Sequence, residues 1–395
     1  MTTDSKSVPE QFIAPHLLDI PKSGIRDFFD IVATRRDIIS LGIGEPDFQT
    51  PWHIREKAMT AIERGFTRYT SNLGMPELRQ ALTTYMKHAF HATYDWKSEV
   101  LVTVGVSEAL DIALRAVLSP GDEVLYHEPC FVAYAPLIRM AHGVPVVVDT
   151  FRKDDFRLTV EELEKKVTPR SRVLLINFPN NPTGACLTKA DTEALADFVI
   201  KHNMLLISDE VYSELTYEGG RHSMAAIHRI RDRLIFMNGF SKAWSMTGFR
   251  LGYVCAPAPL TDAMMKIHQY CMMSAPTVSQ CAGIEALNSG DADIAEMRDS
   301  YHQRRNFLVA SLNEMGLDCF MPRGAFYVFP SIQSTGLTAH EFAMRFLNEY
   351  SVACVPGSAF GACGAGYLRC AYATGIDQLK EAMTRMQTFL KTLKC

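Results

Sequence analysis

The chain has 395 residues, of which 47% are hydrophobic, and this length allows about two to three domains around a large core. Its 40 basic and 44 acidic side chains give a net charge of −4, which leaves no positive surplus for binding nucleic acid. No apolar run reaches the roughly 18 residues that a membrane span needs, and the polar start Met1–Glu10 lacks the apolar core of a secretion signal. We therefore expect no nucleic-acid partner, no membrane partner and no export.

The chain contains ten cysteines at irregular spacing, and none of them forms a C-x-x-C pair. We expect reduced thiols in a cytoplasmic protein, most of them small buried side chains. Cysteines and histidines do not cluster in the sequence, so no metal site is expected.

Short apolar runs alternate with amphipathic stretches through the middle of the chain. The predicted strands are 101–104, 123–126, 144–148, 173–177, 205–208, 234–237 and 251–254. Helical spacing follows the first of these runs and returns at 188–201. Several runs are apolar throughout, which is typical of strands buried on both faces. The pattern predicts an α/β fold with a mostly parallel sheet wrapped by helices.

The pattern changes after about Pro276. A long charged helical stretch covers 291–313, and short strands are predicted at 325–329, 352–356 and 367–372. We expect a second, smaller α+β domain here. No internal repeat or low-complexity linker separates the two parts.

Polar residues directly follow four of the predicted strands. In chain order, these sets are Gly105–Glu108, Phe178–Gly184, Asp209–Tyr212 and Asn238–Lys242. Ligands of parallel α/β sheets bind at the carboxyl ends of the strands, so the four sets should meet at one rim. The rim would then combine an amide, a carboxylate with a phenol, a lysine and a helix start suited to phosphate.

This combination meets the needs of pyridoxal phosphate, which takes a lysine on its aldehyde, an acid at its ring nitrogen and an anion site for its phosphate. Lys242 would carry the cofactor as a Schiff base and serve as general base and acid. Asp209 would keep the ring nitrogen protonated. Asn181 and Tyr212 would hydrogen-bond the ring hydroxyl oxygen, and Tyr212 is counted with the catalytic residues.

The phosphate would lie at the predicted helix start, where Gly105, Val106 and Ser107 offer backbone N–H groups. Ser241 and Arg250 would complete its cage, since an arginine can make a bidentate contact. Phe131 could lie flat on the cofactor ring.

Each of these residues has a plainer interpretation when it is taken alone. An aspartate after a strand is usually a turn or cap residue, and a lysine is usually a solvated surface charge. Asn181–Gly184 could be an ordinary turn, and Phe131 could be a core side chain. Order, spacing and placement at strand ends agree, and this agreement favours the cofactor site.

At this point the chain resembles the class I aminotransferases, which are pyridoxal-phosphate enzymes of fold type I. The resemblance rests on the motifs Ile43–Phe48, Asn181–Gly184, Asp209–Tyr212, Ser241–Gly252, Gly324–Tyr327, Pro356–Ser358 and Leu368–Ala373. It runs from about Pro21 to the end of the chain. Segments Lys266–Tyr270 and Arg304–Phe307 resemble the bacterial I-gamma branch that holds the N-acetyl-L,L-diaminopimelate and aromatic aminotransferases.

The resemblance implies further roles and a domain division. Arg369 is similar to the arginine that pairs with the substrate α-carboxylate, and Gly44 to a backbone contact near it. Phe131 and Asn181 would also border the substrate. Tyr69 resembles a tyrosine that reaches the phosphate of a neighbouring subunit, which implies a homodimer. Residues 1–50 would join the small domain 286–395, and 51–285 would form the large cofactor-binding domain.

Aspartate-type relatives carry a lysine in the phosphate loop, in a pattern like Gly-Gly-Lys-Gln, whereas this chain reads Gly105-Val106-Ser107-Glu108. Strict aspartate specificity is therefore not expected. The resemblance implies ping-pong transfer of the α-amino group from an aromatic amino acid, N-acetyl-diaminopimelate or a broad range of L-amino acids to 2-oxoglutarate.

Three alternatives remain at this point. They are an aspartate aminotransferase, a carbon–sulfur lyase on the same cofactor frame, and a domain that only senses its ligand. One backbone feature is also predicted, a cis bond between Asn181 and Pro182, because the turn must aim the Asn181 side chain at the cofactor.

Overall fold

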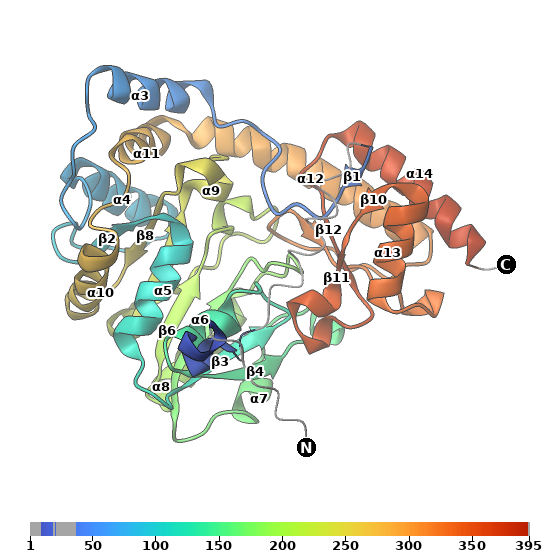
Figure 1. The fold of residues 1–395 in the computed structure, drawn as a ribbon, viewed down its shortest axis with the longest axis horizontal. Coiled ribbons are helices and arrows are strands. Elements are labelled where there is room, and N and C mark those ends of the chain that lie inside the picture. The colour runs from blue at the N-terminus through green and yellow to red at the C-terminus, as the bar shows by residue number, and fades with distance from the viewer. Residues whose placement is uncertain (1–8, 19, 21–36, 394–395) are drawn as a thin grey trace.

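The computed structural model describes residues 9–18, 20 and 37–393 of the chain, and it centres on a seven-stranded sheet (Figure 1). The strands are β2 (Val100–Thr103), β3 (Glu123–Glu128), β4 (Val144–Asp149), β5 (Ser171–Asn177), β6 (Leu205–Asp209), β7 (Leu234–Gly239) and β8 (Gly252–Cys255). Their spatial order is β2-β8-β7-β6-β5-β3-β4, and β8 runs antiparallel to both of its neighbours. The remaining pairs are parallel, so the predicted, mostly parallel sheet is confirmed.

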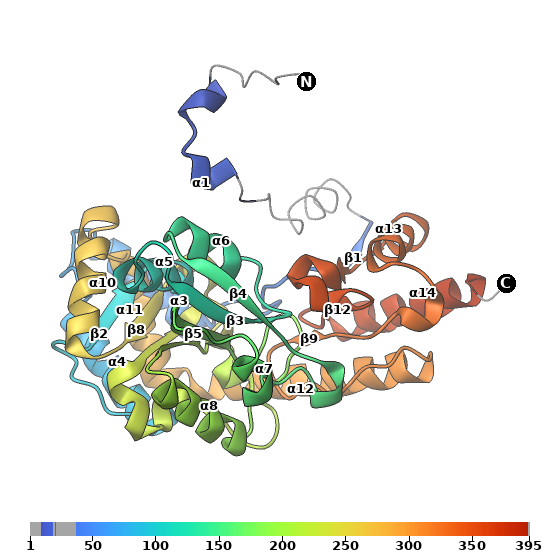
Figure 2. The ribbon, with the colours of Figure 1, turned by 90° about the horizontal axis from the view of Figure 1, so that it is seen from below.

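Both faces of this sheet are covered by helices, which explains why its strands are apolar throughout. On β5, Val173 and Leu175 belong to one core cluster, whereas Leu174 and Ile176 belong to another. Figure 2 shows the layers edge-on. The first cluster includes side chains of α5 (Gly105–Val117), α6 (Tyr134–Met140) and α10 (Ala258–Cys271), and the second those of α4 (Pro76–Ala89), α8 (Lys189–Lys201) and α11 (Thr277–Ser289).

Local sequence explains where several helices begin. The Thr188 side chain and Asp191 form a capping box at the start of α8, as expected for a threonine before a helical run with an acid three residues later. Pro76 occupies the first turn of α4, where its missing N–H costs nothing. The predicted helix at 291–313 is found as α12 (Asp291–Glu314).

A separate core cluster forms around the C-terminal elements. It is built by α12, α13 (Ala339–Tyr350) and α14 (Ile376–Thr392) together with a three-stranded antiparallel sheet, β11 (Val355–Pro356), β12 (Leu368–Ala371) and β9 (Tyr327–Val328). Two residues of the N-terminal segment, Ile39 and Leu41, are buried in the same cluster. Figure 1 shows α12 running from the region of α11 toward this cluster.

Two predicted strands of this region are shorter or divided in the structure. The stretch 352–356 contains two strands, because β10 (Val352–Ala353) pairs with β1 (Ile39–Ser40) and β11 pairs with β12. The chain changes partner at Cys354. The stretch 325–329 keeps only β9, since Ala325 has a left-handed backbone with φ of 58°.

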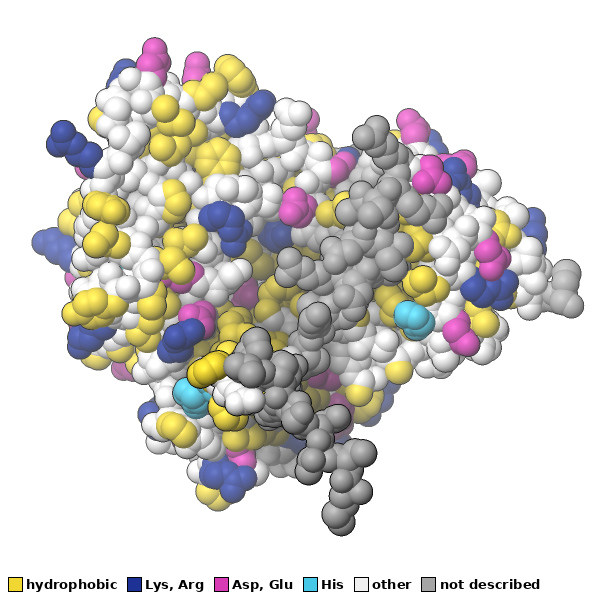
Figure 3. Space-filling view, in the orientation of Figure 1, with side chains coloured by type: hydrophobic (Ala, Val, Ile, Leu, Met, Phe, Trp, Pro, Cys, Tyr) yellow, Lys and Arg dark blue, Asp and Glu magenta, His cyan; other side chains and the backbone are white. Residues whose placement is uncertain are grey.

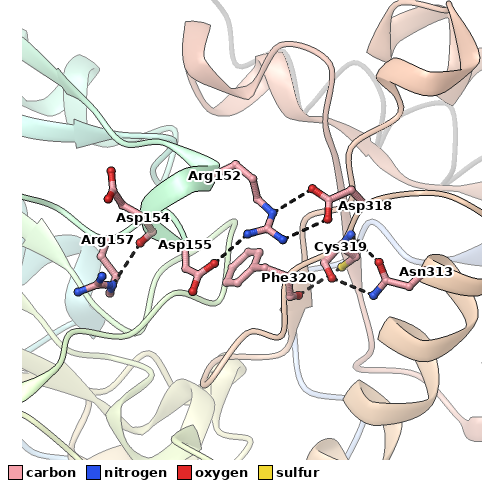
Figure 4. Close-up of polar contacts among 8 residues, drawn as sticks. All are labelled: Arg152, Asp154, Asp155, Arg157, Asn313, Asp318, Cys319 and Phe320. Atoms are coloured by element: carbon pink, nitrogen blue, oxygen red, sulfur yellow. Dashed lines mark hydrogen bonds and ion pairs between the residues drawn. The ribbon is translucent and has the colours of Figure 1, made fainter.

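The sheet and the C-terminal elements also meet through an ion pair (Figure 4). Arg152, which follows β4, donates from Nε and Nη2 to the two carboxylate oxygens of Asp318 at 3.0 and 3.1 Å. Next to it, Phe320 packs on Phe156 with ring centroids 5.6 Å apart. The domain limits 1–50, 51–285 and 286–395 stay a prediction, and Met1–Val8 and the stretch 21–36 lie outside the described residues.

The remaining helices are short or lie at the edges of the fold. They are α1 (Pro15–Leu18), α3 (Trp52–Glu63), α7 (Val160–Glu164), α9 (Phe240–Ala243), and the 3-10 helices η1 (Pro9–Phe12), η2 (Arg152–Asp154), η3 (Ser213–Leu215), η4 (Met224–Ala226), η5 (His228–Arg233), η6 (Thr247–Phe249), η7 (Gln333–Thr335), η8 (Gly357–Phe360) and η9 (Ala362–Gly364). Among the described residues, no helix is long and apolar enough to cross a membrane.

Candidate functional site

A cavity of about 1060 Å³ lies where the carboxyl ends of the parallel strands face the C-terminal elements. Most of the residues singled out from the sequence line it. They are Gly44, Val106, Ser107, Phe131, Asn181, Asp209, Tyr212, Ser241, Lys242, Arg250 and Arg369. The polar sets that follow β2, β5, β6 and β7 therefore do meet at one rim.

Lys242 lies on the short helix α9, immediately after β7, and its side chain points at the N-terminal segment. Nζ donates to the carbonyl oxygen of Gly44 at 2.7 Å. Burial lowers the pKa of Lys242 to about 8; Glu45 opposes this shift, whereas the positive charge of Arg369 adds to it. A substantial fraction of this amine is therefore neutral near physiological pH and can attack an aldehyde or accept a proton.

Asp209 ends β6 at the bottom of the cavity. One carboxylate oxygen accepts from the Tyr134 hydroxyl at 2.8 Å, and the other accepts from the Val211 backbone N–H at 3.2 Å. Burial raises the pKa of Asp209 to about 6, which means that the carboxylate has no fully compensating charge in the protein alone. The position suits a cationic ring nitrogen, which would supply that charge.

Asn177, which the sequence placed only at the end of a strand, connects two of the predicted site residues. Its side chain donates to the Asp209 carbonyl oxygen at 2.9 Å and accepts from the Asn181 backbone N–H at 3.1 Å. The backbone N–H of Asn177 donates to Nε2 of His127 at 3.2 Å, and burial lowers the pKa of His127 to about 4, which keeps this ring neutral. The predicted cis bond between Asn181 and Pro182 is confirmed.

The turn between β2 and α5 lies close to Arg250. Gly105 has a φ of +72°, and a Cβ placed there would lie 2.7 Å from an Nη atom of Arg250. A Cβ on Gly252 would lie 2.7 Å from the Val106 backbone nitrogen, so β8 needs a glycine at this point. Gly105 itself does not line the cavity, whereas Val106, Ser107 and Arg250 do. Their N–H groups, hydroxyl and guanidinium form a donor set that fits a phosphate.

Arg369 is 3% exposed and closes the cavity from the C-terminal side. It donates to Oδ1 of Asn181 at 3.0 Å and to the Gly42 carbonyl oxygen at 2.5 Å. The rings of Tyr327 and Phe360 both lie 4.7 Å from its guanidinium carbon. Its Nε is buried and has no hydrogen-bond partner among the described residues, which leaves a donor for an anion such as a carboxylate.

The remaining predicted residues occupy the walls or lie apart. The Tyr212 hydroxyl is 2.9 Å from that of Tyr327, and burial raises the pKa of Tyr212 well above its ordinary value. Phe131 lines the cavity with its ring edge-to-face to Tyr134. Tyr69 does not line the cavity; it is 80% exposed on the surface, and its predicted contact with a neighbouring subunit stays a prediction.

Five polar residues of the cavity were not singled out from the sequence. They are Glu45, Tyr134, Asn177, Thr247 and Tyr327. Glu45, Thr247 and Tyr327 belong to motifs that carried the resemblance, so their presence could have been inferred. Tyr134 lies three residues after Phe131, across the turn that leads into α6, and this short separation was the signal available for it.

Comparison with known proteins identifies the family. The family model for aminotransferase class I and II matches residues 36–386.

The chain belongs to the class I and II aminotransferases. An aspartate aminotransferase of Pyrococcus abyssi is 46% identical over 94% of this chain and 96% of its own length. A Bacillus subtilis protein named "Probable N-acetyl-LL-diaminopimelate aminotransferase" is 42% identical over 96% of both chains. The crystal structure of an aromatic aminotransferase from Pyrococcus horikoshii superimposes with a TM-score of 0.89 at 46% identity, covering 93% of this chain and 99% of that one.

Enzymes of this family and fold use pyridoxal phosphate, so the protein is a pyridoxal-phosphate-dependent aminotransferase. The donor set fits this cofactor. A partly neutral lysine, an undercompensated buried carboxylate and a phosphate-type turn with an arginine surround one cavity. Asp209 and the turn at Val106 would hold the two ends of the cofactor, and Lys242 would reach its aldehyde.

Proposed function

We propose that this aminotransferase moves the α-amino group of an aromatic or long-chain L-amino acid, including an N-acylated diamino acid, to 2-oxoglutarate by a ping-pong mechanism. The observation that carries the choice of donor is the chemistry of the cavity lining. Among the described lining residues, the cationic side chains are Lys242, Arg250 and Arg369, and each has a role at the cofactor or the α-carboxylate. None of the three is left for a second carboxylate on the donor.

The rest of the lining supports the same choice. It contains the apolar side chains Ile43, Val106, Leu110, Phe131, Val132, Leu137 and Val211. Glu45 of the N-terminal segment is also in the lining, and a negative charge there would repel a dicarboxylate. A large apolar side chain gains more from this wall than the short acid of aspartate does.

The residues divide the chemistry among themselves. When bound, pyridoxal phosphate supplies an electron sink for the pair left behind at the substrate Cα. Arg369, whose side chain lines the cavity, binds and orients the α-carboxylate through its guanidinium group. Lys242 takes the Cα proton and returns it on the cofactor side, acting first as base and then as acid. Asp209 holds the ring nitrogen in its protonated form, and Asn181 and Tyr212 fix the ring hydroxyl.

We also propose that two copies of the chain form a homodimer. The loop that carries Tyr69 packs on the loop after α10, where Asn72 donates to the Met273 carbonyl oxygen at 2.6 Å. Tyr69 and Tyr270 are 80% and 87% exposed, and Met272 is about half exposed. Figure 3 shows many exposed hydrophobic side chains on the part of the molecule that carries these elements. Covering such side chains favours association.

The cytoplasm is the proposed location. Nine cysteines lie among the described residues and all of them are free thiols, which is usual in a reducing compartment.

Kinetics with phenylalanine, tyrosine, N-acetyl-L,L-diaminopimelate and aspartate against 2-oxoglutarate tests the donor. We expect kcat/KM for at least one of the first three to equal or exceed that for aspartate. A matched variant, Glu45→Gln, should raise kcat/KM for aspartate more than for phenylalanine, because it removes the opposing charge. A preference for aspartate of about a hundredfold over all other donors, close to 3 kcal/mol, would contradict the proposal.

A further inference from the structure

The turn that would hold the cofactor phosphate is fixed from behind by a buried pair, Glu108 and His268. Glu108 lies in the first turn of α5, and its side chain bends back so that Oε2 accepts from the backbone N–H of Val104 at 2.5 Å. Its Oε1 lies 2.6 Å from Nδ1 of His268. The exposed fractions of the two side chains are 5% and 0%.

On the cavity side, the same turn has no room to move. Gly105 lies against the Arg250 guanidinium, and the turn passes directly over Gly252. The Thr103 hydroxyl donates to the Gly105 carbonyl oxygen at 3.0 Å, which fixes the entry to the turn. The hydrogen bond from Val104 to Glu108 holds the opposite side of this turn, directly before the N–H groups of Val106 and Ser107.

His268 connects this turn to a second helix. It lies in the last turn of α10, which packs along α5, and its own backbone carbonyl accepts from Met272 at 2.8 Å. A carboxylate can only accept hydrogen bonds, so Nδ1 carries the proton. Nε2 is buried without a hydrogen-bond partner among the described residues, which is costly for a ring nitrogen. The hydrogen bond from Nδ1 to Glu108 is therefore the polar contact that this buried imidazole makes.

We propose that Glu108 and His268 are positioning residues for the cofactor phosphate. The pair keeps the N–H groups of Val106 and Ser107 aimed into the cavity, and it holds the Glu108 carboxylate turned away from a ligand of the same charge. Neither residue lines the cavity, so both act through the turn. This inference rests on the proposed placement of the phosphate at that turn.

The test compares two ligands of the full-length protein after removal of its cofactor: pyridoxal phosphate, and pyridoxal, which lacks the phosphate. Calorimetric titration of the Glu108→Ala variant should show affinity for pyridoxal phosphate lowered by about ten- to a hundredfold, as is usual when a residue that orients a ligating group is lost. Affinity for pyridoxal should change by less than about threefold. His268→Leu keeps the buried volume. It should also lower the ratio of the affinity for pyridoxal phosphate to the affinity for pyridoxal.

Glu108→Gln separates hydrogen bonding from charge. The amide oxygen still accepts from Val104, and the amide nitrogen can donate to Nδ1 of the other histidine tautomer, so most of the preference for pyridoxal phosphate should return. Glu123→Ala is the matched control, because Glu123 is also a buried carboxylate and accepts hydrogen bonds from Thr168 and Arg170. Glu123 is the first residue of β3, at the edge of the sheet away from the cavity. It should lower stability and leave the ratio of the two affinities unchanged.

Arg250→Gln distinguishes a failure of the inference from a failure of the placement. If Arg250→Gln loses the preference for pyridoxal phosphate while Glu108→Ala and His268→Leu keep it, the pair does not position the phosphate and only this inference is overturned. If Arg250→Gln also keeps the preference, the phosphate does not bind at this turn, and both are overturned. Equal weakening of both ligands by Glu108→Ala would assign the pair a purely structural role.

Discussion

The two ends of the cavity are constructed in different ways. At the cofactor end, Asp209, Asn177 and the turn at Val106 all come from the sheet and the segments that directly follow its strands. At the substrate end, Arg369 lies on β12 and reaches Asn181 on one side and Gly42 of the N-terminal segment on the other. One end belongs to a single sheet, whereas the other joins three distant parts of the chain.

This difference separates chemistry from specificity. A rim made by neighbouring strands keeps its geometry as long as the sheet folds, which suits the cofactor that every reaction of this family needs. A wall made by segments from different parts of the chain can change with each of them. The related enzymes named for aspartate, aromatic and diaminopimelate substrates agree with such a division.

Substitution at the cofactor end should have the largest effect on turnover. Lys242→Ala removes the group that moves the Cα proton, so kcat should fall by about ten-thousandfold or more. Cofactor binding should persist, because Asp209 and the phosphate turn remain. Stopped-flow and steady-state assays measure the first quantity, and titration with pyridoxal phosphate measures the second. Retention of about a tenth of the turnover would exclude the assigned role.

Asp209→Ala should follow, with kcat lower by about a hundred- to a thousandfold, the loss expected when a buried electrostatic partner is removed. Asp209→Glu should keep part of the rate, since it restores the carboxylate. Asn181→Ala provides a control at the same end, with a smaller loss expected because it removes neutral hydrogen bonds, those of the amide to the ring hydroxyl and to Arg369, and leaves the charge of Asp209 in place. Near-normal turnover of Asp209→Ala would refute the role of the carboxylate.

Asp209, which the reaction needs, should lower the stability of the cofactor-free protein at neutral pH. The pKa of Asp209 is raised from 3.8 to about 6, so between these values the folded chain binds more protons than the unfolded chain. Its stability therefore falls as the pH rises through this range. Asp209→Asn should be more stable than the wild type above pH 6, by up to about 3 kcal/mol, and the gain should vanish near pH 4. Thermal unfolding at several pH values measures the difference; a gain that is largest in acid would contradict it.

At the substrate end, Arg369→Ala should lower kcat/KM by a similar factor for every donor, because all donors share the α-carboxylate. A buried, bidentate charge pair is worth about 2–4 kcal/mol. Arg305→Ala is a matched control, since Arg305 is 1% exposed in the same C-terminal core and binds Glu218 instead. It should reduce stability without lowering kcat/KM by the same factor for every donor. A loss of kcat/KM confined to one donor would show that Arg369 contacts the side chain of that donor and not the shared α-carboxylate.

Tyr134→Phe should have the smallest effect of the series. It removes one hydrogen bond to Asp209, and a net loss of about 1 kcal/mol, roughly fivefold in kcat, is expected. The missing donor should also raise the pKa of Asp209 further, since the hydroxyl favours the ionised form. Titration of the cofactor-free variant by NMR checks the direction. An unchanged or lower pKa of Asp209 would show that the hydroxyl does not act on the carboxylate.

Much of the cofactor end could be predicted from the sequence because its residues follow continuous apolar strands. Asp209 directly follows the apolar run 205–208, and Lys242 ends the polar set Asn238–Lys242 that follows the run 234–237. The rule that ligands bind at strand ends brought the two residues together. Asn177 was missed because it is the last residue of β5 and was interpreted as part of the strand. Its side chain carries a link between β5 and β6 that no local pattern encodes.

The substrate end could be predicted only through the resemblance. Arg369 stands within an ordinary short strand, and its contacts with Asn181 and Gly42 span most of the chain. The division of 352–356 into two strands has the same origin, since β10 and β11 pair with partners far apart in sequence. Glu108 and His268 lie on two different helices and are far apart in the sequence, so helical periodicity cannot reveal their contact.

The central claim is that Lys242 carries the cofactor at the rim of the sheet. Borohydride reduction of the full-length enzyme with bound pyridoxal phosphate, followed by peptide mapping, tests it most directly. The account predicts a single stable cofactor label on the peptide that contains Lys242, and no label on that peptide in Lys242→Ala. A stoichiometric label on any other lysine of the wild-type chain would contradict it.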